Sequence, residues 1–294
     1  MAFNVKTFYT RATTALVFVA LLLGCVWYNY YSFVAFFTIV GFIGLNEFFK
    51  LSEKLDSRPH KVLGYILFIL AMGLHVVFTY KMKLHHENYD GYNEYDDEIF
   101  YSYSKMIMIF FLLTPFVLLI IELFRIKQKF SNIAYTLISI AYVILPIVLL
   151  TLICHKTNTF DPNKVLGMIF FVWINDTGAY LVGSFFGKHK LFERISPNKT
   201  WEGTLGGIAL CIALSFVVAQ MFPQLPQVHW VAISIIVAVF GNLGDLVESM
   251  LKRMAGVKDS GSLMPGHGGV LDRFDSLFFA TPFVFCYLAL MGLL

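Results

Sequence analysis

The chain has 294 residues, of which 58% are hydrophobic and only 14% are Asp, Glu, Lys or Arg, and its formal net charge is +3. A soluble globular protein carries about 45–50% apolar and about 25% charged residues, so this composition excludes an ordinary water-soluble domain. We expect a lipid bilayer as its surroundings and no nucleic-acid partner.

Apolar stretches of about 17 to 22 residues recur along the chain, and each could cross a hydrocarbon core of about 30 Å as a helix. Backbone groups must be satisfied inside lipid, and the stretches lack the alternation of a membrane barrel, so helices are predicted. The fold class is an all-α polytopic membrane protein with about nine transmembrane helices. The spans are expected near residues 12–28, 31–49, 62–80, 106–124, 133–153, 165–186, 203–222, 230–250 and 276–294.

The cations lie mainly in alternate connections between these spans. All but five of the 22 Lys and Arg residues fall before the first span or after the second, fourth, sixth and eighth. By the positive-inside rule, the amino terminus and these connections are predicted to be cytoplasmic, and the carboxy terminus to lie outside. The exceptions are Lys81, Lys83, Lys105, Lys156 and Lys164.

The four cysteines stand singly inside expected spans, at Cys25, Cys154, Cys211 and Cys286. Neither a disulfide framework nor a thiolate metal site is expected. The run that ends at Cys25 also resembles a cleavable lipoprotein signal, but the apolar sequence resumes almost at once, which favours a retained span.

Ionisable residues divide the chain into two parts. Few occur within the first five spans, whereas the last four spans and their cytoplasmic connections are rich in them. We expect one integral domain with a scaffold half of five helices at residues 1–160 and a catalytic half of four helices at residues 161–294.

One carboxylate, Asp176, falls well inside the sixth expected span. Charges inside spans are costly and usually face a cavity or a partner. Both a packing carboxylate with a basic partner and a substrate or metal contact fit Asp176. The small residues after it, including Gly178 and Gly183, have spacings suited to close helix packing.

Five carboxylates near the last two spans have a spacing of interest. Asp245 and Glu248 are three residues apart, as are Asp272 and Asp275, so each pair shares a helix face. With Asp259 they form a set that a hard cation such as Mg²⁺ would bind. The alternative is ion pairing with the neighbouring cations Lys252, Arg253, Lys258 and Arg273.

Two loop segments have features of phosphate binding. The turn Pro265-Gly266-His267-Gly268-Gly269 cannot be regular helix, and its glycines allow backbone amides to approach a phosphate. His267 fits either a phosphate donor or an ordinary loop residue. The run from Ser196 to Thr200 resembles a helix start, and a helix amino terminus beside Lys199 would attract an anion.

Taken together, these residues resemble a known family. Ser249-x-x-Lys252-Arg253, Lys258-Asp259, Pro265-x-His267-Gly268-Gly269 and Asp272-Arg273-x-Asp275 are similar to the C-terminal motif of the phosphatidate cytidylyltransferases, or CDP-diacylglycerol synthases. Asp176 to Tyr180, Gly183, Gly187-Lys188 and Ser196-Pro197-x-Lys199-Thr200-Trp201-Glu202-Gly203 resemble further stretches of that family. The likeness covers roughly the last 120 residues. It departs at Asn198, where a second Lys is expected, and at Met264, where Leu or Ile is usual.

The resemblance implies a transferase of phospholipid biosynthesis that moves CMP from CTP to phosphatidic acid, giving CDP-diacylglycerol and pyrophosphate. It implies Mg²⁺ as cofactor, with a second metal or a monovalent cation left open, and a homodimer as the assembly. The enzyme would lie in the inner membrane with its active site facing the cytoplasm. A transporter or channel, or an enzyme acting on another lipid phosphate or a polyprenol, remains the alternative.

Roles follow from the resemblance and the chemistry of the side chains. Catalytic residues are Asp259, Asp272, Asp275, Lys252 and Arg253. Substrate-binding residues are Asp176, Ser196, Lys199, Lys258, His267, Gly268, Gly269 and Arg273. Metal ligands are Asp259, Asp272, Asp275, Asp245 and Glu248.

Overall fold

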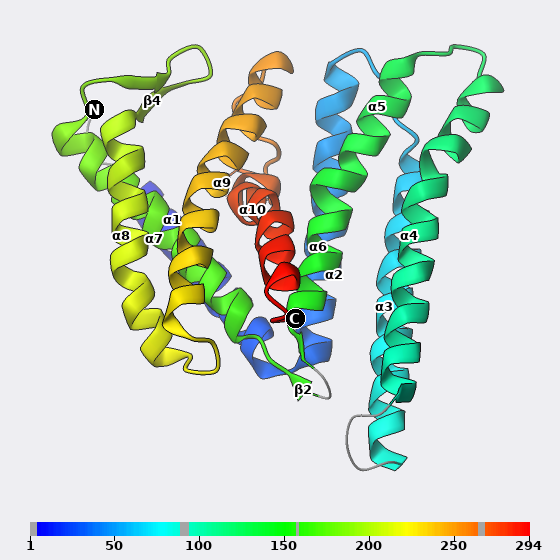
Figure 1. Ribbon diagram of the computed structural model, residues 1–294. Coiled ribbons are helices and arrows are strands. Elements are labelled where there is room, and N and C mark those ends of the chain that lie inside the picture. Colours follow the sequence, from blue (N-terminus) through cyan, green and yellow to red (C-terminus); the bar gives the residue numbers. More distant parts are fainter. Residues whose placement is uncertain (1–4, 89–93, 157–158, 264–267) are drawn as a thin grey trace.

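The computed structural model describes residues 5–88, 94–156, 159–263 and 268–294, and most of them are helical (Figure 1). The helices are α1 (Val5–Tyr28), α2 (Tyr30–Lys54), α3 (Lys61–Asn88), α4 (Glu94–Leu123), α5 (Phe130–Ser139), the π-helical turn η1 (Ile140–Ile144), α6 (Leu145–Ile153), α7 (Asn163–Phe186), α8 (Trp201–Met221), α9 (Gln227–Met254) and α10 (Leu271–Leu290). Two antiparallel hairpins pair β1 (His155–Lys156) with β2 (Thr159–Phe160) and β3 (Lys190–Phe192) with β4 (Ser196–Thr200).

Eight helical stretches among the described residues are long and apolar enough to cross a membrane. In this set α5, η1 and α6 form one continuous span, Phe130–Ile153. The apolar part of α1, Thr13–Tyr28, is shorter. The predicted fold class is confirmed, and the chain is a multi-pass membrane protein. The side of the membrane on which each terminus lies remains a prediction.

The last span differs from its expected limits. It was expected near residue 276, but α10 already begins at Leu271. The earlier start has a physical cause, because carboxylates satisfy the amides that open the helix: Gly269 N donates to Asp272, and Val270 N and Leu271 N donate to Glu47. Asp272 and Asp275 therefore lie in the first turns of a helix.

The connections that carry most of the cations lie at one end of the helical bundle. Figure 1 shows the β3–β4 hairpin, the end of α9 and the start of α5 at the same end, and β2, the end of α3 and the start of α4 at the other. The structure thus gives the alternate connections a common side, as the charge pattern predicts. Figure 1 also shows α10 beginning well below the end of α9.

Small residues bring α7 and α8 close together. A side chain added at Gly178 would lie 3.2 Å from the Gly207 backbone, and one added at Gly203 would lie 2.6 Å from Ala179 O and 3.1 Å from Gly183 Cα. Backbones at this distance leave no room for a larger residue. The packing role predicted for Gly178 and Gly183 is confirmed.

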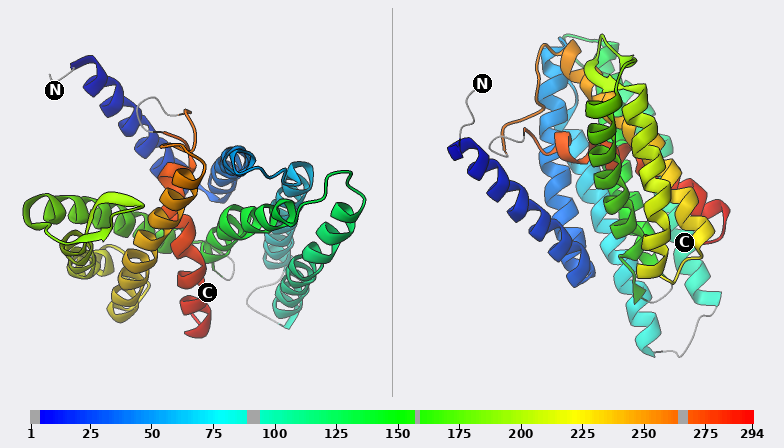
Figure 2. Two further views of the ribbon diagram at one scale, coloured as in Figure 1. Left: turned by 90° about the horizontal axis from the view of Figure 1, so that it is seen from above. Right: turned by 90° about the vertical axis from the view of Figure 1, so that its left-hand side faces the viewer.

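The two halves of the chain meet along α10. This helix packs along α9 and also contacts α2, η1, α6 and α7. Seen from above in Figure 2, α9 and α10 lie between the pair α7 and α8 on one side and α5 on the other. A residue of the first half can therefore reach the start of α10. The division into scaffold and catalytic halves at residue 160 remains a prediction.

Candidate functional site

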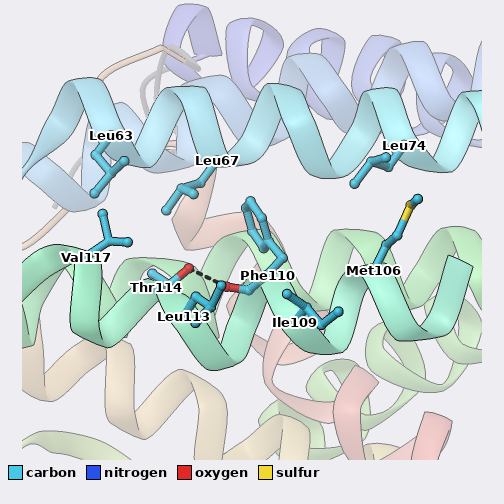
Figure 3. A pocket seen from close by; sticks show the side chains of 9 residues that line it. All are labelled: Leu63, Leu67, Leu74, Met106, Ile109, Phe110, Leu113, Thr114 and Val117. Carbon is cyan, nitrogen blue, oxygen red and sulfur yellow. Dashed lines mark hydrogen bonds between the residues drawn. The ribbon is translucent and has the colours of Figure 1, made fainter.

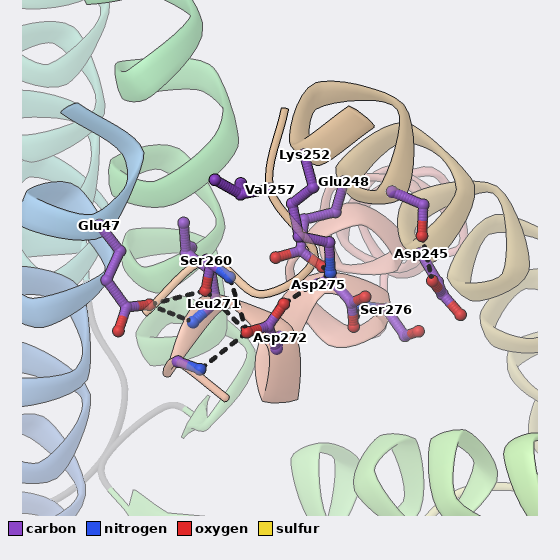
Figure 4. A network of polar contacts seen from close by, with 12 residues as sticks. Glu47, Asp245, Glu248, Lys252, Val257, Ser260, Leu271, Asp272, Asp275 and Ser276 are labelled. Atoms are coloured by element: carbon purple, nitrogen blue, oxygen red, sulfur yellow. Dashed lines mark hydrogen bonds and ion pairs between the residues drawn. The ribbon is translucent and has the colours of Figure 1, made fainter. Parts of the chain in front are cut away.

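Lys252 is at the centre of a polar cluster between α9 and α10 (Figure 4). Its Nζ atom donates to Glu248 Oε2 at 2.8 Å and to Asp272 Oδ1 at 2.5 Å. Glu248 lies one turn before Lys252 on the same face of α9, whereas Asp272 is in the first turn of α10. The ammonium group thus joins the last two helices, and all three side chains are largely buried.

Asp272 also organises the segment that precedes α10. Its Oδ2 atom accepts hydrogen bonds from Ser260 N at 2.9 Å, Ser260 Oγ at 3.0 Å and Gly269 N at 2.7 Å. Gly268 adopts φ +82°, a left-handed conformation that favours glycine, and a side chain there would meet Asp272 Oδ2. Both glycines of the predicted phosphate-binding turn thus lie against the Asp272 carboxylate, and their approach to a phosphate remains a prediction.

Glu47, on α2, completes the cluster, and the sequence interpretation missed it. It is 5% exposed, and its two carboxylate oxygens accept from Val270 N at 3.0 Å, Leu271 N at 2.9 Å and Ser260 Oγ at 3.1 Å. Figure 4 shows it reaching these groups from outside the last two helices. A carboxylate inside an apolar span is itself a signal of function, and Glu47 falls in the expected span 31–49.

Asp245 forms a second cluster one turn before Glu248. Its Oδ2 atom lies 2.6 Å from Lys199 Nζ, and its Oδ1 atom accepts from Ser249 Oγ at 3.2 Å. Lys199 comes from β4, so this ion pair ties the β3–β4 hairpin to α9. The structure therefore brings Lys199 beside a carboxylate, where a bound phosphate would have to compete with Asp245 for the ammonium group.

Two carboxylates of the site, Glu248 and Asp275, are buried. Glu248 is 1% exposed, and its Oε1 atom receives no hydrogen bond from an N–H or hydroxyl group among the described residues, but its carboxyl group lies beside that of Asp275. Asp275 is 8% exposed, and its Oδ1 atom accepts from Ser276 N at 2.6 Å. Two adjacent buried carboxylates repel each other, so a cation or a shared proton would be stabilised at this point.

The helix start predicted beside Lys199 is confirmed, because α8 begins at Trp201 directly after the run from Ser196 to Thr200 and has Glu202 in its first turn. The run itself forms strand β4, so Ser196 is not the cap. Thr200 does cap α8, because its hydroxyl accepts from Gly203 N at 3.2 Å. Glu202 then accepts from Lys188 N and lies 2.6 Å from His189 Nδ1. Of the two cap candidates in the pattern, Thr200 is therefore the cap, and Ser196 pairs within the hairpin.

The remaining predicted residues lie around the rim of the cluster. Arg253, Lys258, Asp259 and Arg273 are exposed at this end of α9 and α10, and Asp176 is exposed on α7. Arg253 Nη1 donates to Val257 O at 3.4 Å. Gly268 lies between Asp259 and Asp272, since an added side chain would be 3.5 Å from Asp259 Cβ. His267 lies outside the described residues, and its role remains a prediction.

The donor set suits a hard divalent cation in its chemistry. The cluster offers carboxylates and no sulfur ligand among its described members, as Mg²⁺ prefers, and Glu248 and Asp275 contribute two adjacent buried carboxylates. However, no three His, Cys, Asp or Glu side chains within the described ranges are grouped as a ready metal site. Ion pairing, the alternative left open by the sequence, is present for Glu248, Asp272 and Asp245. The metal-ligand assignments remain predictions.

An apolar groove elsewhere has a different character. It lies between α3 and α4, encloses about 390 Å³ and is lined almost wholly by aliphatic side chains, including Leu63, Leu67 and Leu113 (Figure 3). The hydroxyl of Thr114 in its wall donates to Phe110 O. Nothing in this lining would stabilise a phosphate or a metal ion, so the polar cluster at α9 and α10 is the candidate site.

Three relatives with curated names are similar to part of the chain. Proteins named phosphatidate cytidylyltransferase from Staphylococcus epidermidis strain RP62A and Staphylococcus aureus strain COL are 47% and 43% identical over 160 residues, which is 53% of this chain and 60% of each relative. The protein of that name from Bacillus subtilis strain 168 is 52% identical over 123 residues, 41% of this chain and 45% of the relative. The aligned part therefore spans at most about 60% of these relatives' length.

A family comparison covers almost the whole chain. The family described as the Cytidylyltransferase family matches residues 9–291. This range includes α2, with Glu47, as well as α9 and α10, with the candidate site. On this match, the chain belongs to the cytidylyltransferase family.

Proposed function

We propose that this protein is a phosphatidate cytidylyltransferase, which transfers CMP from CTP to phosphatidic acid and releases CDP-diacylglycerol and pyrophosphate. The family match and the printed names of the relatives support this activity. The observation that carries the proposal is the buried cluster in which Lys252 joins the carboxylates of Glu248 and Asp272, in a chain that spans a membrane several times.

The reaction needs two polyanions to meet. An oxygen of the phosphatidate headgroup would attack the α-phosphorus of CTP, forming a new P–O bond while the bond to the β-phosphate breaks and pyrophosphate leaves. That oxygen is already ionised near neutral pH, so the reaction needs no strong base. Its main requirement is fixed positive charge around the reacting phosphates.

The cations of the site suit this requirement. We assign Lys252, Arg253, Lys258 and Arg273 to the nucleotide phosphates, together with the backbone amides of the glycine turn. Lys199 and Ser196 on β4 are assigned to the lipid phosphate or the triphosphate. Asp176, exposed on α7, is assigned to substrate contact.

Mg²⁺ is the proposed cofactor, and when bound it would neutralise charge on the phosphates. Its proposed ligands come from Asp259, Asp272, Asp275, Asp245 and Glu248. Lys252 and Lys199 now pair with three of these carboxylates. Each lysine could then turn to a phosphate when its carboxylate binds the metal ion. A second metal or a monovalent cation remains open.

The site is proposed to face the cytoplasm in the plasma membrane, where CTP is available. The distribution of Lys and Arg residues supports this orientation, because the cation-rich connections share one end of the bundle (Figure 1). A homodimer, which the family resemblance implies, belongs to the same proposal.

The test is direct incubation of the purified protein with labelled CTP, phosphatidic acid in detergent micelles and Mg²⁺. We expect CMP label in the lipid fraction and an equal amount of released pyrophosphate. Transfer to a polyprenol phosphate but not to phosphatidic acid would contradict the proposed substrate. No turnover with any lipid phosphate would contradict the proposed reaction.

A matched pair of variants tests the site. Asp275→Asn removes a buried carboxylate of the cluster and is expected to lower turnover by about 10²- to 10³-fold, the usual effect of losing one positioned electrostatic contact. Asp56→Asn removes an exposed carboxylate that lies 2.5 Å from Lys129 at the same end of the bundle, and little change is expected. Near wild-type turnover in Asp275→Asn at saturating Mg²⁺ would contradict the assignment.

A further inference from the structure

We propose that Glu47 is a positioning residue for the candidate site, which acts from the first half of the chain by holding the segment that orients Asp272. This inference rests on the proposed function, because its effect is read in that reaction. Glu47 is on α2, more than 200 positions before the groups that it binds.

The start of α10 supplies the first part of the argument. A helix leaves its first amides without partners inside the helix, and the residue at this helix start, Val270, offers no side-chain cap. Glu47 replaces that cap, with Oε1 accepting from Val270 N at 3.0 Å and Oε2 accepting from Leu271 N at 2.9 Å. A carboxylate here also interacts favourably with the positive end of the helix dipole.

Ser260 supplies the second part, because it connects Glu47 to Asp272. Its hydroxyl is 3.1 Å from Glu47 Oε2 and 3.0 Å from Asp272 Oδ2, and its backbone N donates to the same Asp272 oxygen at 2.9 Å. Asp272 in turn holds Lys252 through its other oxygen. The chain of contacts therefore runs from α2 through Ser260 to the central cation of the site (Figure 4).

The packing around the carboxylate supplies the third part. A side chain added at Gly261 or Gly269 would collide with the Glu47 carboxylate. Gly261 and Gly269, on the two sides of residues 264–267, thus both pack against this side chain. Burial at 5% exposure strengthens each hydrogen bond and makes the loss of one costly.

Glu47→Gln is the principal test. The amide keeps the size of the side chain but places an NH₂ group against backbone donors. We expect kcat to fall by about tenfold per folded molecule, which equals about 1.4 kcal/mol in the barrier, while KM for phosphatidic acid stays unchanged. A purely structural role would reduce the amount of folded protein but not the turnover of the molecules that fold.

Glu53→Gln is the matched control. Glu53 is on the same helix, and it forms an exposed ion pair with Lys61 at 2.8 Å, away from the site. Its loss removes the same charge from α2 and should leave kcat within about twofold, since exposed pairs contribute little.

Hydrogen exchange gives a readout that does not depend on activity. In Glu47→Gln, the amides of Val270 and Leu271 should exchange at least about tenfold faster than in wild type, whereas Glu53→Gln should not change them. Unchanged exchange together with unchanged kcat would overturn the inference.

Ser260→Ala keeps the test decisive if Glu47→Gln does not fold. It removes the hydroxyl that connects the two carboxylates but leaves Glu47 and Asp272 in place, and we expect a smaller fall in kcat without faster exchange at Leu271. Full activity in Ser260→Ala, when Glu47→Gln fails to fold, would make Glu47 structural only and overturn the inference. A wild-type protein without turnover would instead contradict the proposed function.

Discussion

Two buried polar clusters lie at the same end of the bundle, and they differ in whether their carboxylates are satisfied. In the first half, Glu122 Oε1 accepts from Lys129 N at 2.8 Å and Asn132 Nδ2 at 2.7 Å. Its Oε2 atom lies 2.8 Å from His60 Nε2 and accepts from Arg125 Nη1 at 3.4 Å. This cluster joins the turn before α3 to the start of α5, and both carboxylate oxygens have partners.

The cluster at α9 and α10 contains more carboxylates than its two lysines can pair with. Glu47, Asp245, Glu248, Asp272 and Asp275 gather there, and Lys199 and Lys252 are the lysines with which they form ion pairs. Glu248 and Asp275 are two buried carboxylates that lie side by side. The difference separates the two clusters: the single carboxylate of Glu122 has a partner for each oxygen, whereas the second cluster has adjacent carboxylates that an added cation would stabilise.

The largest expected effect comes from removing the central cation. Lys252→Met should lower turnover by about 10²- to 10³-fold, because Lys252 is held by Glu248 and Asp272 where a phosphate charge would be stabilised. Lys129→Met, which removes an exposed cation from the other cluster, should leave turnover within about twofold. The measurement is CMP transfer per folded molecule, and equal losses in both variants would remove the distinction between the clusters.

For Glu122→Gln we expect a loss of stability and little loss of turnover. It should lower the free energy of unfolding by about 1–3 kcal/mol, because buried partners of the carboxylate are left without an acceptor. Turnover of the folded protein should change little. Thermal unfolding in detergent and a CMP transfer assay measure the two quantities, and a variant that is stable but inactive would contradict a structural role for Glu122.

Metal addition tests the cluster at α9 and α10 by a measurement that does not depend on turnover. Mg²⁺ in the absence of nucleotide should raise the thermal midpoint of the wild type, because a ligand that binds the folded state stabilises it, by roughly 2–4 °C per kcal/mol. The shift should shrink in Asp275→Asn. Sodium chloride at matched ionic strength is the control, and an equal shift with sodium would indicate screening in place of a bound divalent ion.

The smallest expected effect is a pH dependence of stability, which His60 in the Glu122 cluster would cause. Burial and the neighbouring Arg125 lower the pKa of His60 below its usual value, and Glu122 opposes this shift. The unfolded chain then takes up the proton first, so His60 contributes stability above about pH 6.5 that is lost as the pH falls toward its lowered pKa. His60→Gln should flatten the fall in thermal midpoint between about pH 7.5 and about pH 5.5. If the thermal midpoint of His60→Gln fell with pH as steeply as that of the wild type, groups other than His60 would cause the fall.

The sequence predicted the membrane class and most spans because hydrophobic length is a local property. It also identified Lys252, Glu248 and Asp272, which the structure brings together. These three residues could be identified because they lie close in sequence, on the two helices that flank the glycine turn. The ion pair of Lys199 with Asp245, by contrast, joins residues on different elements and was not foreseen.

The missed features depend on contacts between distant segments. Glu47 is a single carboxylate in an apolar span, and only the fold shows that the start of α10 lies beside it. The helix start beside Lys199 was predicted, but the pairing of Ser196 with β3 in a hairpin before that helix was not. Such pairings are set by the tertiary fold, which local patterns do not contain.

The contact of Glu47 with α10 limits how the chain can be recombined. A chimera that takes residues 1–160 from one relative and the rest from another would place two independently varied surfaces against each other at this point. It should retain function only where the donor supplies an acidic side chain in register with the amides of Val270 and Leu271.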